Sequence, residues 1–522
     1  MTGNRHKFHL VLLIIILGIA FSVRIKGIWF GYPLPVHPDE PHLVERALNM
    51  VRTGDLNPHF FNYPTLNMYL LALIYRVITL GSEALFGLSA ADVPVIWFYI
   101  AGRVFNVAVS VLTVFVTYEL GRRLISSSAG LISAAFITFS PLHVANSFTI
   151  TVDASVALWL SLATLMAVLI YAKEKKLVYY LLAGVCVGCA VGSKYTAVVG
   201  VAPILIAHYK QSRDKRDWVD ANVIALLVVS PAAFLITTPY AILDYETFVS
   251  ALKYEAAHYS TGHPGFEADG STSFYLYGRY LLGEGYGLIP TLFSGLGLIW
   301  LLRKDPWKAA ILASAPVLLF LLVGRYKVFF PRNVVAVVPF LSVFSGFLVA
   351  GAYKWLSART FNARVSKRMM LGAKALLVGV LVGSLCMPAV AAVRYVNRIT
   401  LPDTRWVSIE WIKRNIPEGS SIGREYYTPP LEEYTDSHEV VFLGTFAVAR
   451  KLEDVERMDY MIVSAGDYDR FFSAPDKYPQ ECRAYSTFFD AQELVHEFVP
   501  DMRTLGGPKV SIYKIRTRLH QD

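Results

Sequence analysis

The chain has 522 residues, of which 54% are hydrophobic and only 17% are charged, whereas soluble proteins carry about 25% charged residues. This composition excludes a fold built around one water-soluble core. The formal net charge of +9 would suggest nucleic-acid binding in a soluble protein. Here the charges are sorted into loops between apolar runs, so no nucleic-acid partner is expected.

Apolar runs divide most of the chain, and several approach the roughly 20 residues that cross a bilayer core. Clusters of Lys and Arg alternate with them, and such clusters mark the cytoplasmic side of a membrane protein. Placing every cluster inside predicts about eleven transmembrane helices in a multi-pass plasma-membrane protein, with the N-terminus cytoplasmic. The runs include 10–23, 104–120, 177–192, 334–350 and 371–390, and the clusters lie at 5–7, 122–123, 173–176, 210–216, 303–304 and 359–368.

The first apolar run follows Arg5 and Lys7 and could pass for a secretory signal peptide. We interpret it as an uncleaved span, because no convincing small-residue cleavage site follows. Residues 40–100 are then expected to form one outer loop with juxtamembrane helices. Residues 42–52 have apolar side chains at helical spacing with charges opposite, which is typical of a helix lying on a membrane. The run 65–80 is not counted as a span, because counting it would place the cluster at 122–123 outside.

After residue 390 the sequence changes character. A helix is predicted at 406–416, followed by short strands at 421–425, 440–443, 460–464 and 510–515. The predicted fold is therefore a polytopic α-helical membrane protein with a small C-terminal α/β soluble domain whose sheet is mostly parallel. We place the transmembrane domain at 1–390 and an extracytoplasmic domain at 391–522.

The four cysteines give little sign of redox chemistry. Cys186, Cys189 and Cys386 fall inside apolar runs, where the first two are best explained as small helix-packing residues. Cys482 is alone in the soluble segment and cannot form an internal disulfide there.

The first outer loop contains the adjacent acids Asp39 and Glu40, held between Pro38 and Pro41 directly after the first span. Proline restricts the backbone on both sides, and the nearby membrane surface has a low dielectric constant. This is a suitable place for a general base. The structural alternative is that either acid caps the helix predicted at 42–52.

Asp153 and Lys194 are charged residues at the outer ends of apolar runs. A carboxylate at the depth of Asp153 is costly unless it faces a polar cavity or a partner, although it could also cap the following helix. Lys194 lies against the trend that places cations inside. It could reach lipid headgroups or bind an anionic ligand in a cavity.

Further cations face outward. Arg325, Lys327 and Arg332 lie on one short outer loop, and Arg103 opens an outer end of another run. Such a cluster suits a lipid-linked phosphate, whose chain lies in the membrane while its charge lies at the interface. Ordinary binding of membrane-lipid headgroups is the alternative.

The outer loop at 239–285 contains Glu255, His258, His263 and Asp269 among several glycines. A Glu/His pair at helical spacing can bind zinc, but no H-E-x-x-H pattern is present. A glycine-rich mobile lid over a cavity is the preferred interpretation.

Taken in order, these residues resemble the C-type glycosyltransferases, and among them the protein O-mannosyltransferases and the bacterial aminoarabinose transferase of lipid A. The resemblance covers about residues 1–350 and rests on motif order more than on any single motif. The chain departs from the aminoarabinose transferase where that family has Glu-Lys-Pro. The matching positions are Asp39-Glu40, Asn62-Tyr63-Pro64, Arg103, Asp153, Gly192-Ser193-Lys194-Tyr195, Arg325, Arg332 and Pro339.

The resemblance implies an inverting membrane glycosyltransferase that moves a monosaccharide, a hexose or a pentose, from a polyprenyl-phosphate donor such as dolichyl phosphate mannose. The acceptor would be a protein, lipid or glycan at the outer face of the cell envelope. Asp39 would be the general base, and Glu40 would orient the acceptor or sugar. The implied phosphate-binding residues are Lys194, Arg103, Arg325 and Arg332, and the implied cavity residues are Asp153, Tyr63, Tyr195, His258 and His263.

No metal ligand or required cofactor is implied, although some relatives suggest a divalent cation near Asp39 and Asp153. A transporter or lipid flippase is the main competing interpretation, since it would also have many spans and outer cations. Transporters often carry inverted repeats, and none is evident here. A membrane-anchored receptor is a third interpretation, but it would leave the loop acids without a role.

Overall fold

The computed structural model describes residues 2–172, 176–212, 218–263, 265–266, 273–359, 367–449 and 452–516. These residues form two compact units. The first, which we call the helical unit, comprises residues 1–28, 37–263 and 267–396. The second, the tail unit, comprises residues 29–36, 264–266 and 397–522.

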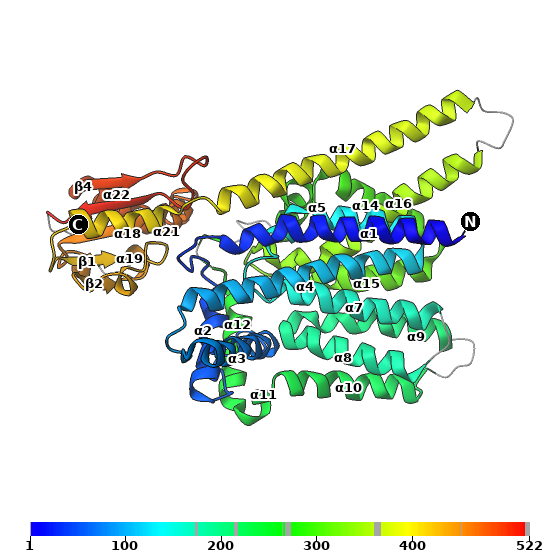
Figure 1. The fold of residues 1–522 in the computed structure, drawn as a ribbon, viewed down its shortest axis with the longest axis horizontal. Coiled ribbons are helices and arrows are strands. Elements are labelled where there is room, and N and C mark those ends of the chain that lie inside the picture. Colours follow the sequence, from blue (N-terminus) through cyan, green and yellow to red (C-terminus); the bar gives the residue numbers. More distant parts are fainter. Residues whose placement is uncertain are drawn as a thin grey trace. The chain divides into compact units, whose positions relative to one another are not determined.

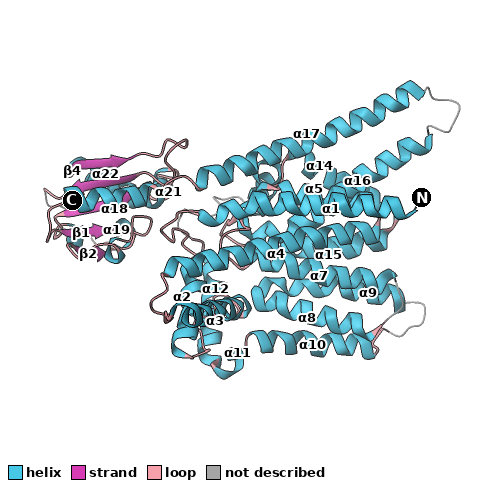
Figure 2. Ribbon diagram, in the orientation of Figure 1, coloured by secondary structure: helices cyan, strands magenta, loops and turns pink. Residues whose placement is uncertain are grey.

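The helical unit contains a bundle of long helices, with shorter helices at one end (Figure 1, Figure 2). Three short helical segments, η1 (Lys26–Trp29), η2 (Tyr195–Val201) and η4 (Pro331–Val337), are of the 3₁₀ type, and η3 (Leu281–Gly285) is a π-helix. The α-helices are α1 (Thr2–Ile25), α2 (Glu40–Thr53), α3 (Leu66–Phe86), α4 (Val95–Leu124), α5 (Ser127–Phe139), α6 (Pro141–Ala145), α7 (Asp153–Ala172), α8 (Leu177–Ser193), α9 (Ala202–Ser212), α10 (Ala221–Thr237), α11 (Tyr240–Leu243), α12 (Tyr245–Thr261), α13 (Ser273–Tyr280), α14 (Leu288–Lys304), α15 (Pro306–Val323), α16 (Val338–Arg359) and α17 (Lys367–Ile399).

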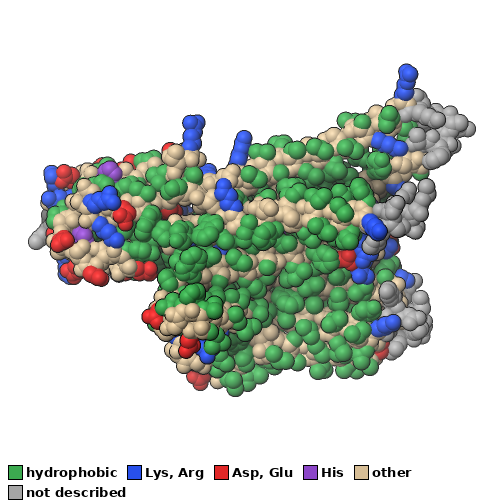
Figure 3. Space-filling view, in the orientation of Figure 1, with side chains coloured by type: hydrophobic (Ala, Val, Ile, Leu, Met, Phe, Trp, Pro, Cys, Tyr) green, Lys and Arg blue, Asp and Glu red, His purple; other side chains and the backbone are tan. Residues whose placement is uncertain are grey.

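Apolar side chains cover the face of this bundle seen in Figure 3, and Lys and Arg side chains gather toward its ends. This distribution is that of a protein whose flanks face lipid. The chain is therefore a multi-span membrane protein with a mostly helical fold, as predicted. Among the described residues, 7 helices are long and apolar enough to cross a membrane, or 8 if the bent pair Ser273–Gly285 and Leu288–Lys304 is one span.

The predicted number of about eleven crossings is not confirmed by this test. Three further apolar helices, α5, α8 and α10, are shorter than the 18 residues required here of a candidate span. Helix α3 is long and apolar enough to be a span, although the charge pattern predicted that this segment does not cross the membrane. Figure 1 shows α2, α3 and α12 together at one end of the bundle, and α2 and α3 share a small apolar core that includes Leu43 and Tyr75.

Small residues allow the long helices to approach closely. A Cβ atom on Gly130 of α5 would lie 2.6 Å from the backbone oxygen of Tyr118 in α4, and one on Gly346 of α16 would lie 2.6 Å from that of Ala129. Helix association in lipid depends on such close packing, because lipid tails are as apolar as the side chains.

One buried cation fixes α1 against the end of α5. Arg24 of α1 has no exposed surface, and its guanidinium donates to the backbone oxygens of Ile137 and Thr138 at 3.2 Å each. It also contacts Nδ1 of His143 at 2.9 Å. Arg24 thus satisfies carbonyl groups that the end of a helix leaves without intrahelical donors.

The tail unit contains a five-stranded sheet in the order β2-β1-β3-β5-β4. Strands β1, β2 and β3 are parallel, whereas β5 is antiparallel to both β3 and β4. The predicted helix and four predicted strands are present, but β4 was not anticipated. The strands are β1 (Ser421–Arg424), β2 (Glu439–Phe442), β3 (Tyr460–Ser464), β4 (Glu493–Phe498) and β5 (Val510–Lys514), and the α-helices are α18 (Thr404–Asn415), α19 (Phe446–Ala449), α20 (Leu452–Val455), α21 (Ala465–Phe472) and α22 (Pro479–Ala491).

Two short segments from earlier in the chain belong to the tail unit. Leu34 is fully buried in an apolar core that includes Ile409 and Ile412 of α18. The backbone N–H of Gly265 donates to the hydroxyl of Tyr478 at 2.8 Å. The tail unit therefore includes residues 29–36 and 264–266 as well as the C-terminal segment.

Candidate active site

Asp39 lies in a short loop at the start of α2. It occupies the N-cap position, but its side chain makes no capping hydrogen bond. The carboxylate instead faces Arg332, whose Nη1 lies 2.9 Å from Oδ2 of Asp39. This contact lacks hydrogen-bond geometry, and among the described residues the buried Oδ2 atom has no hydrogen-bond partner. The capping alternative therefore does not account for this side chain, whose charged partner is Arg332.

Arg332 lies between two acids. It is the second residue of η4, and its Nε is 3.9 Å from Oδ2 of Asp153. Its guanidinium also lies over the ring of Phe330, 4.5 Å from the ring centre. The side chain remains 25% exposed. A charged guanidinium with some solvent access, placed between two carboxylates, is a site where an anionic ligand can compete.

Lys194 completes this charged cluster. It follows α8 directly, and its Nζ donates to Oδ1 of Asp153 and to Oδ1 of Asn333, each at 2.8 Å. Asn333 in turn donates to the hydroxyl of Tyr277 at 3.0 Å. The structure therefore brings together Asp39, Asp153, Lys194 and Arg332, four residues selected from the sequence, and adds Asn333 and Tyr277, which were not.

Glu40 and Arg103 lie beside this cluster but face the interior. Nη2 of Arg103 donates to Oε2 of Glu40 at 2.6 Å and Nε to Oε1 at 3.0 Å, and neither side chain has exposed surface. Glu40 also accepts from the backbone of Ile150 at 3.0 Å, and Arg103 donates to the backbone oxygen of Ile28 at 2.9 Å. Because both side chains are buried, direct contact of Glu40 or Arg103 with substrate stays a prediction. The pair joins the loop carrying Asp39 to α4 and to the segment before Asp153.

Arg325 lies apart from the charged cluster, and its predicted contact with the donor phosphate stays a prediction. It is exposed and makes no contact with the charged cluster among the residues that the structure describes. Its position after α15 places it on the surface, where binding of membrane-lipid headgroups is the simpler role for a cation.

Aromatic residues predicted to line the cavity lie around the acids. Burial raises the pKa of the Tyr63 hydroxyl well above its usual range, and the negative charge of Asp39 adds to this shift. Burial and then Arg332 lower the pKa of His258, whose ring is 5.3 Å from that of His263. Tyr195 donates through its hydroxyl to the backbone oxygen of Phe61 at 2.8 Å, which identifies it as a support for the Asn62-Tyr63 segment.

Glu255 of α12 is a site residue that the sequence argument considered only as a zinc ligand. Burial raises its pKa above the usual value, while a hydrogen bond from Asn62 and the charges of Lys194 and Arg332 oppose the rise. Burial and the negative charge of Glu255 raise the pKa of the Tyr259 hydroxyl well above its usual range, while the positive charge of Arg332 opposes the rise. Helical spacing from His258 was the available signal, since it places Glu255 near the histidines.

Among the described residues no group of three or more His, Cys, Asp or Glu side chains could hold a metal ion. Asp39 and Asp153, the acids that relatives suggested for a divalent cation, are instead each paired with a cation. The zinc interpretation of Glu255 and His258 likewise finds no third ligand in the described part of the chain. Residues 264 and 267–272, including Asp269 and much of the expected lid, lie outside the described residues.

The site is therefore a charged cluster at the end of α8 and at the starts of η4 and α7, within a bundle of membrane helices. The chain has the C-type glycosyltransferase fold, which confirms the resemblance drawn from the sequence. Residues 98–242 match the family model for dolichyl-phosphate-mannose-protein mannosyltransferase. No curated protein matches the sequence.

Solved structures support the same fold at low sequence identity. ArnT from Cupriavidus metallidurans in the apo state is 15% identical, with 99% of this chain and 100% of that chain covered and a TM-score of 0.56. The structure of the same protein bound to undecaprenyl phosphate is 14% identical, with 99% of this chain and 99% of that chain covered and a TM-score of 0.55. The apo oligosaccharyltransferase from Archaeoglobus fulgidus is 13% identical, with coverage of 91% and 72% and a TM-score of 0.58.

Proposed function

We propose that the protein is a glycosyltransferase that moves a monosaccharide from a polyprenyl-phosphate donor to an acceptor at the extracytoplasmic face of the membrane. The observation that carries this proposal is the Asp39 carboxylate, whose buried Oδ2 faces Arg332 without a hydrogen bond. The ArnT structure with undecaprenyl phosphate and an archaeal oligosaccharyltransferase structure with dolichol-phosphate support a lipid-linked donor.

In the proposed reaction, the acceptor oxygen attacks the anomeric carbon while the bond from that carbon to the phosphate oxygen breaks. Asp39 takes the acceptor proton, and the lipid phosphate leaves with the bonding electron pair. A single in-line displacement of this kind inverts the anomeric carbon. One carboxylate is then sufficient for the proton transfer.

Arg332 and Lys194 would neutralise the charge that develops on the leaving phosphate. Fixed cations in a partly dry site can do this without a metal. A phosphate that binds Arg332 would compete with Asp39 and Asp153 for the same guanidinium. Donor binding would thereby free the Asp39 carboxylate to act on the acceptor.

Asp153 and Asn333 are proposed as positioning residues, because both hold Nζ of Lys194 at 2.8 Å. Tyr63, His258 and Glu255 would form the side of the cavity near α12, where the sugar and acceptor meet. Residues 37–40 and 62–63 therefore matter most for acceptor approach. Movement of the donor lipid across the bilayer without sugar transfer would instead favour the flippase interpretation.

Direct transfer is tested by reconstituting the protein into vesicles with a radiolabelled polyprenyl-phosphate sugar and a peptide acceptor. We expect labelled acceptor and free polyprenyl phosphate to appear together. If the lipid crosses the bilayer with its sugar bond intact and no product forms with peptide, lipid or glycan acceptors, the proposed activity is wrong.

Lys194→Ala and Arg332→Ala should each weaken binding of polyprenyl phosphate while leaving the fold intact. A lost charge-assisted contact to phosphate is worth about 2 kcal/mol or more, so we expect a loss of affinity of roughly 30-fold or greater. The measurement is lipid affinity of the purified variants, with the exposed Arg325→Ala as the matched control. If affinity is unchanged in both variants, these cations do not bind the donor phosphate, and contact with membrane-lipid headgroups is the remaining interpretation.

The proposed orientation places α3 and the tail unit outside and Lys176 in the cytoplasm. A cysteine at Leu80, in a variant lacking the native cysteines, should react with a membrane-impermeant reagent in intact cells, whereas one at Lys176 should react only after lysis. Both positions are surface-accessible residues. Labelling at 176 without labelling at 80 would reverse the proposed orientation.

A further inference from the structure

A cavity of about 450 Å³ lies at the end of the bundle opposite the Asp39 cluster. Four helices form it, at the ends of α4, α7 and α9 and the beginning of α15. Its volume falls within the roughly 300–1,000 Å³ of small-molecule sites. The lining residues are Arg123, Leu124, Val168, Tyr171, Ala172, Lys210, Gln211 and Lys308.

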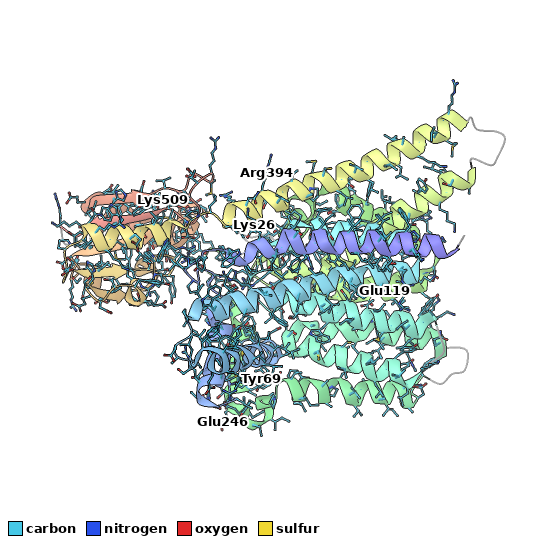
Figure 4. All side chains as sticks on the ribbon, viewed as in Figure 1. Lys26, Tyr69, Glu119, Glu246, Arg394 and Lys509 are labelled. Atoms are coloured by element: carbon cyan, nitrogen blue, oxygen red, sulfur yellow. The ribbon has the colours of Figure 1, made fainter. Side chains whose placement is uncertain are left out.

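The cavity is separate from the proposed active site. Helix α7 begins at Asp153 in the charged cluster and ends at Ala172 in the cavity wall, and its 20 residues span about 30 Å. That length is close to the thickness of a bilayer core. Figure 4 shows Glu119, the ion-pair partner of Arg123, near the end of α4 that is far from Tyr69.

The lining carries more positive charge than negative charge. Arg122 and Arg123 share one carboxylate, Glu119, at 2.7 and 2.8 Å. Lys308 pairs with Asp305 at 3.3 Å. No carboxylate among the described residues pairs with the third lining cation, Lys210.

Hydrogen bonds between polar residues join the walls of the cavity. Gln211 donates to the backbone oxygen of Tyr171 at 2.7 Å, which fixes its side chain against the end of α7. The Tyr171 hydroxyl donates to the Asp305 carboxylate at 3.3 Å. These contacts join the cavity walls, so that the lining cations are held by packed helices.

Aromatic side chains place the cavity at membrane-interface depth. Nζ of Lys210 lies 5.8 Å from the ring centre of Trp307, and the Tyr209 ring is 5.9 Å from Trp307 and 5.8 Å from Trp218. Trp and Tyr collect where hydrocarbon meets headgroups. Basic pockets between transmembrane helices at this depth suit phosphate-bearing headgroups.

We propose that this cavity is a second phosphate-binding site, distinct from the donor site, on the opposite face of the membrane. Its ligand is a phosphate group with a net negative charge, carried either by an anionic lipid headgroup or by a small soluble molecule. Lys210 supplies the charge without a described ionic partner, while Arg123 and Lys308 form the sides.

The test compares Lys210→Gln with Lys176→Gln, which removes an exposed cation at the same end of the bundle but outside the cavity. One probe is phosphatidylglycerol retained by the whole protein in native mass spectrometry, with phosphatidylcholine as the zwitterionic reference. The other is inorganic phosphate, measured by calorimetry on protein in phosphatidylcholine nanodiscs. Melting temperatures of both variants are measured first, to confirm that each is folded.

We expect Lys210→Gln to weaken binding of one probe by roughly fivefold or more, the effect of one Lys near a phosphate, and Lys176→Gln to leave it unchanged. Weaker retention of phosphatidylglycerol assigns the site to a lipid headgroup. Weaker binding of inorganic phosphate alone assigns it to a soluble ligand. Equal loss in both variants, or no loss with either probe, would overturn the proposal and leave the cavity's cations as part of the positive-inside charge pattern.

Discussion

The Asp39→Asn variant should insert, fold and bind donor lipid, yet transfer sugar about 100-fold more slowly or worse. Asparagine keeps the size of the side chain and much of its hydrogen bonding, but it removes the proton acceptor. The measurement is single-turnover sugar transfer in vesicles, with lipid affinity determined on the same preparation. Glu45→Gln is the matched control, because Glu45 is an exposed acid on the same helix, α2.

The competing roles of Asp39 give different results in this experiment. A helix cap would tolerate the change, since Asn caps about as well as Asp, and the structure shows no capping bond from Asp39. If turnover per folded molecule is nearly parental, Asp39 is not the base. Loss of lipid binding together with turnover would instead identify Asp39 as an ion-pair partner that holds Arg332 in place.

Much of the charged cluster could be predicted because its members violate simple rules of membrane sequence. Lys194 is a cation at the end of an apolar run that the charge pattern predicts to be outside, Asp153 is an acid at the edge of an apolar run, and Asp39 is an acid in a segment between two prolines. Each is costly at that depth unless it has a partner. The structure shows that the partners are one another, together with Arg332.

Other features could not be read from the sequence, because they depend on distant segments. Arg103 and Arg332 look alike as outer cations, yet one is buried against Glu40 and the other stays partly exposed beside Asp39. Asn333 is an ordinary polar residue until Lys194 reaches it from α8. In the tail unit, β4 alternates weakly, since most of its side chains are only half-buried or exposed, so its pattern resembles a loop.

Span counting shows a related limit. Helix α3 is long and apolar enough to cross a membrane, although the charge pattern did not predict it as a span. Helices α5, α8 and α10 are apolar but shorter than a typical span. A helix packed among other helices can be shorter or more polar than one that faces lipid on all sides, because its neighbours satisfy its polar groups. Composition alone therefore does not separate juxtamembrane helices from crossing ones here.

Glu40→Gln should destabilise the folded protein far more than Glu45→Gln does. The substitution leaves the fully buried Arg103 guanidinium without its ionic partner, and breaking a buried ion pair in this way costs about 3–5 kcal/mol. The measurement is thermal unfolding of the purified variants in one detergent, followed by turnover per folded molecule. We expect a large fall in melting temperature and a smaller effect on turnover of the molecules that remain folded.

A second substitution separates this positioning role from direct contact with substrate. Replacing both charges, in Glu40→Gln with Arg103→Met, also removes the buried cation that has lost Glu40 and should restore a large part of the lost stability. Recovery will be incomplete, because the Ile28 carbonyl loses its donor. If Glu40 instead orients the acceptor, Glu40→Gln will retain parental stability and lose turnover, and the double variant will not recover activity. A larger loss of turnover per folded molecule than in Asp39→Asn would move the general base by one residue, to Glu40.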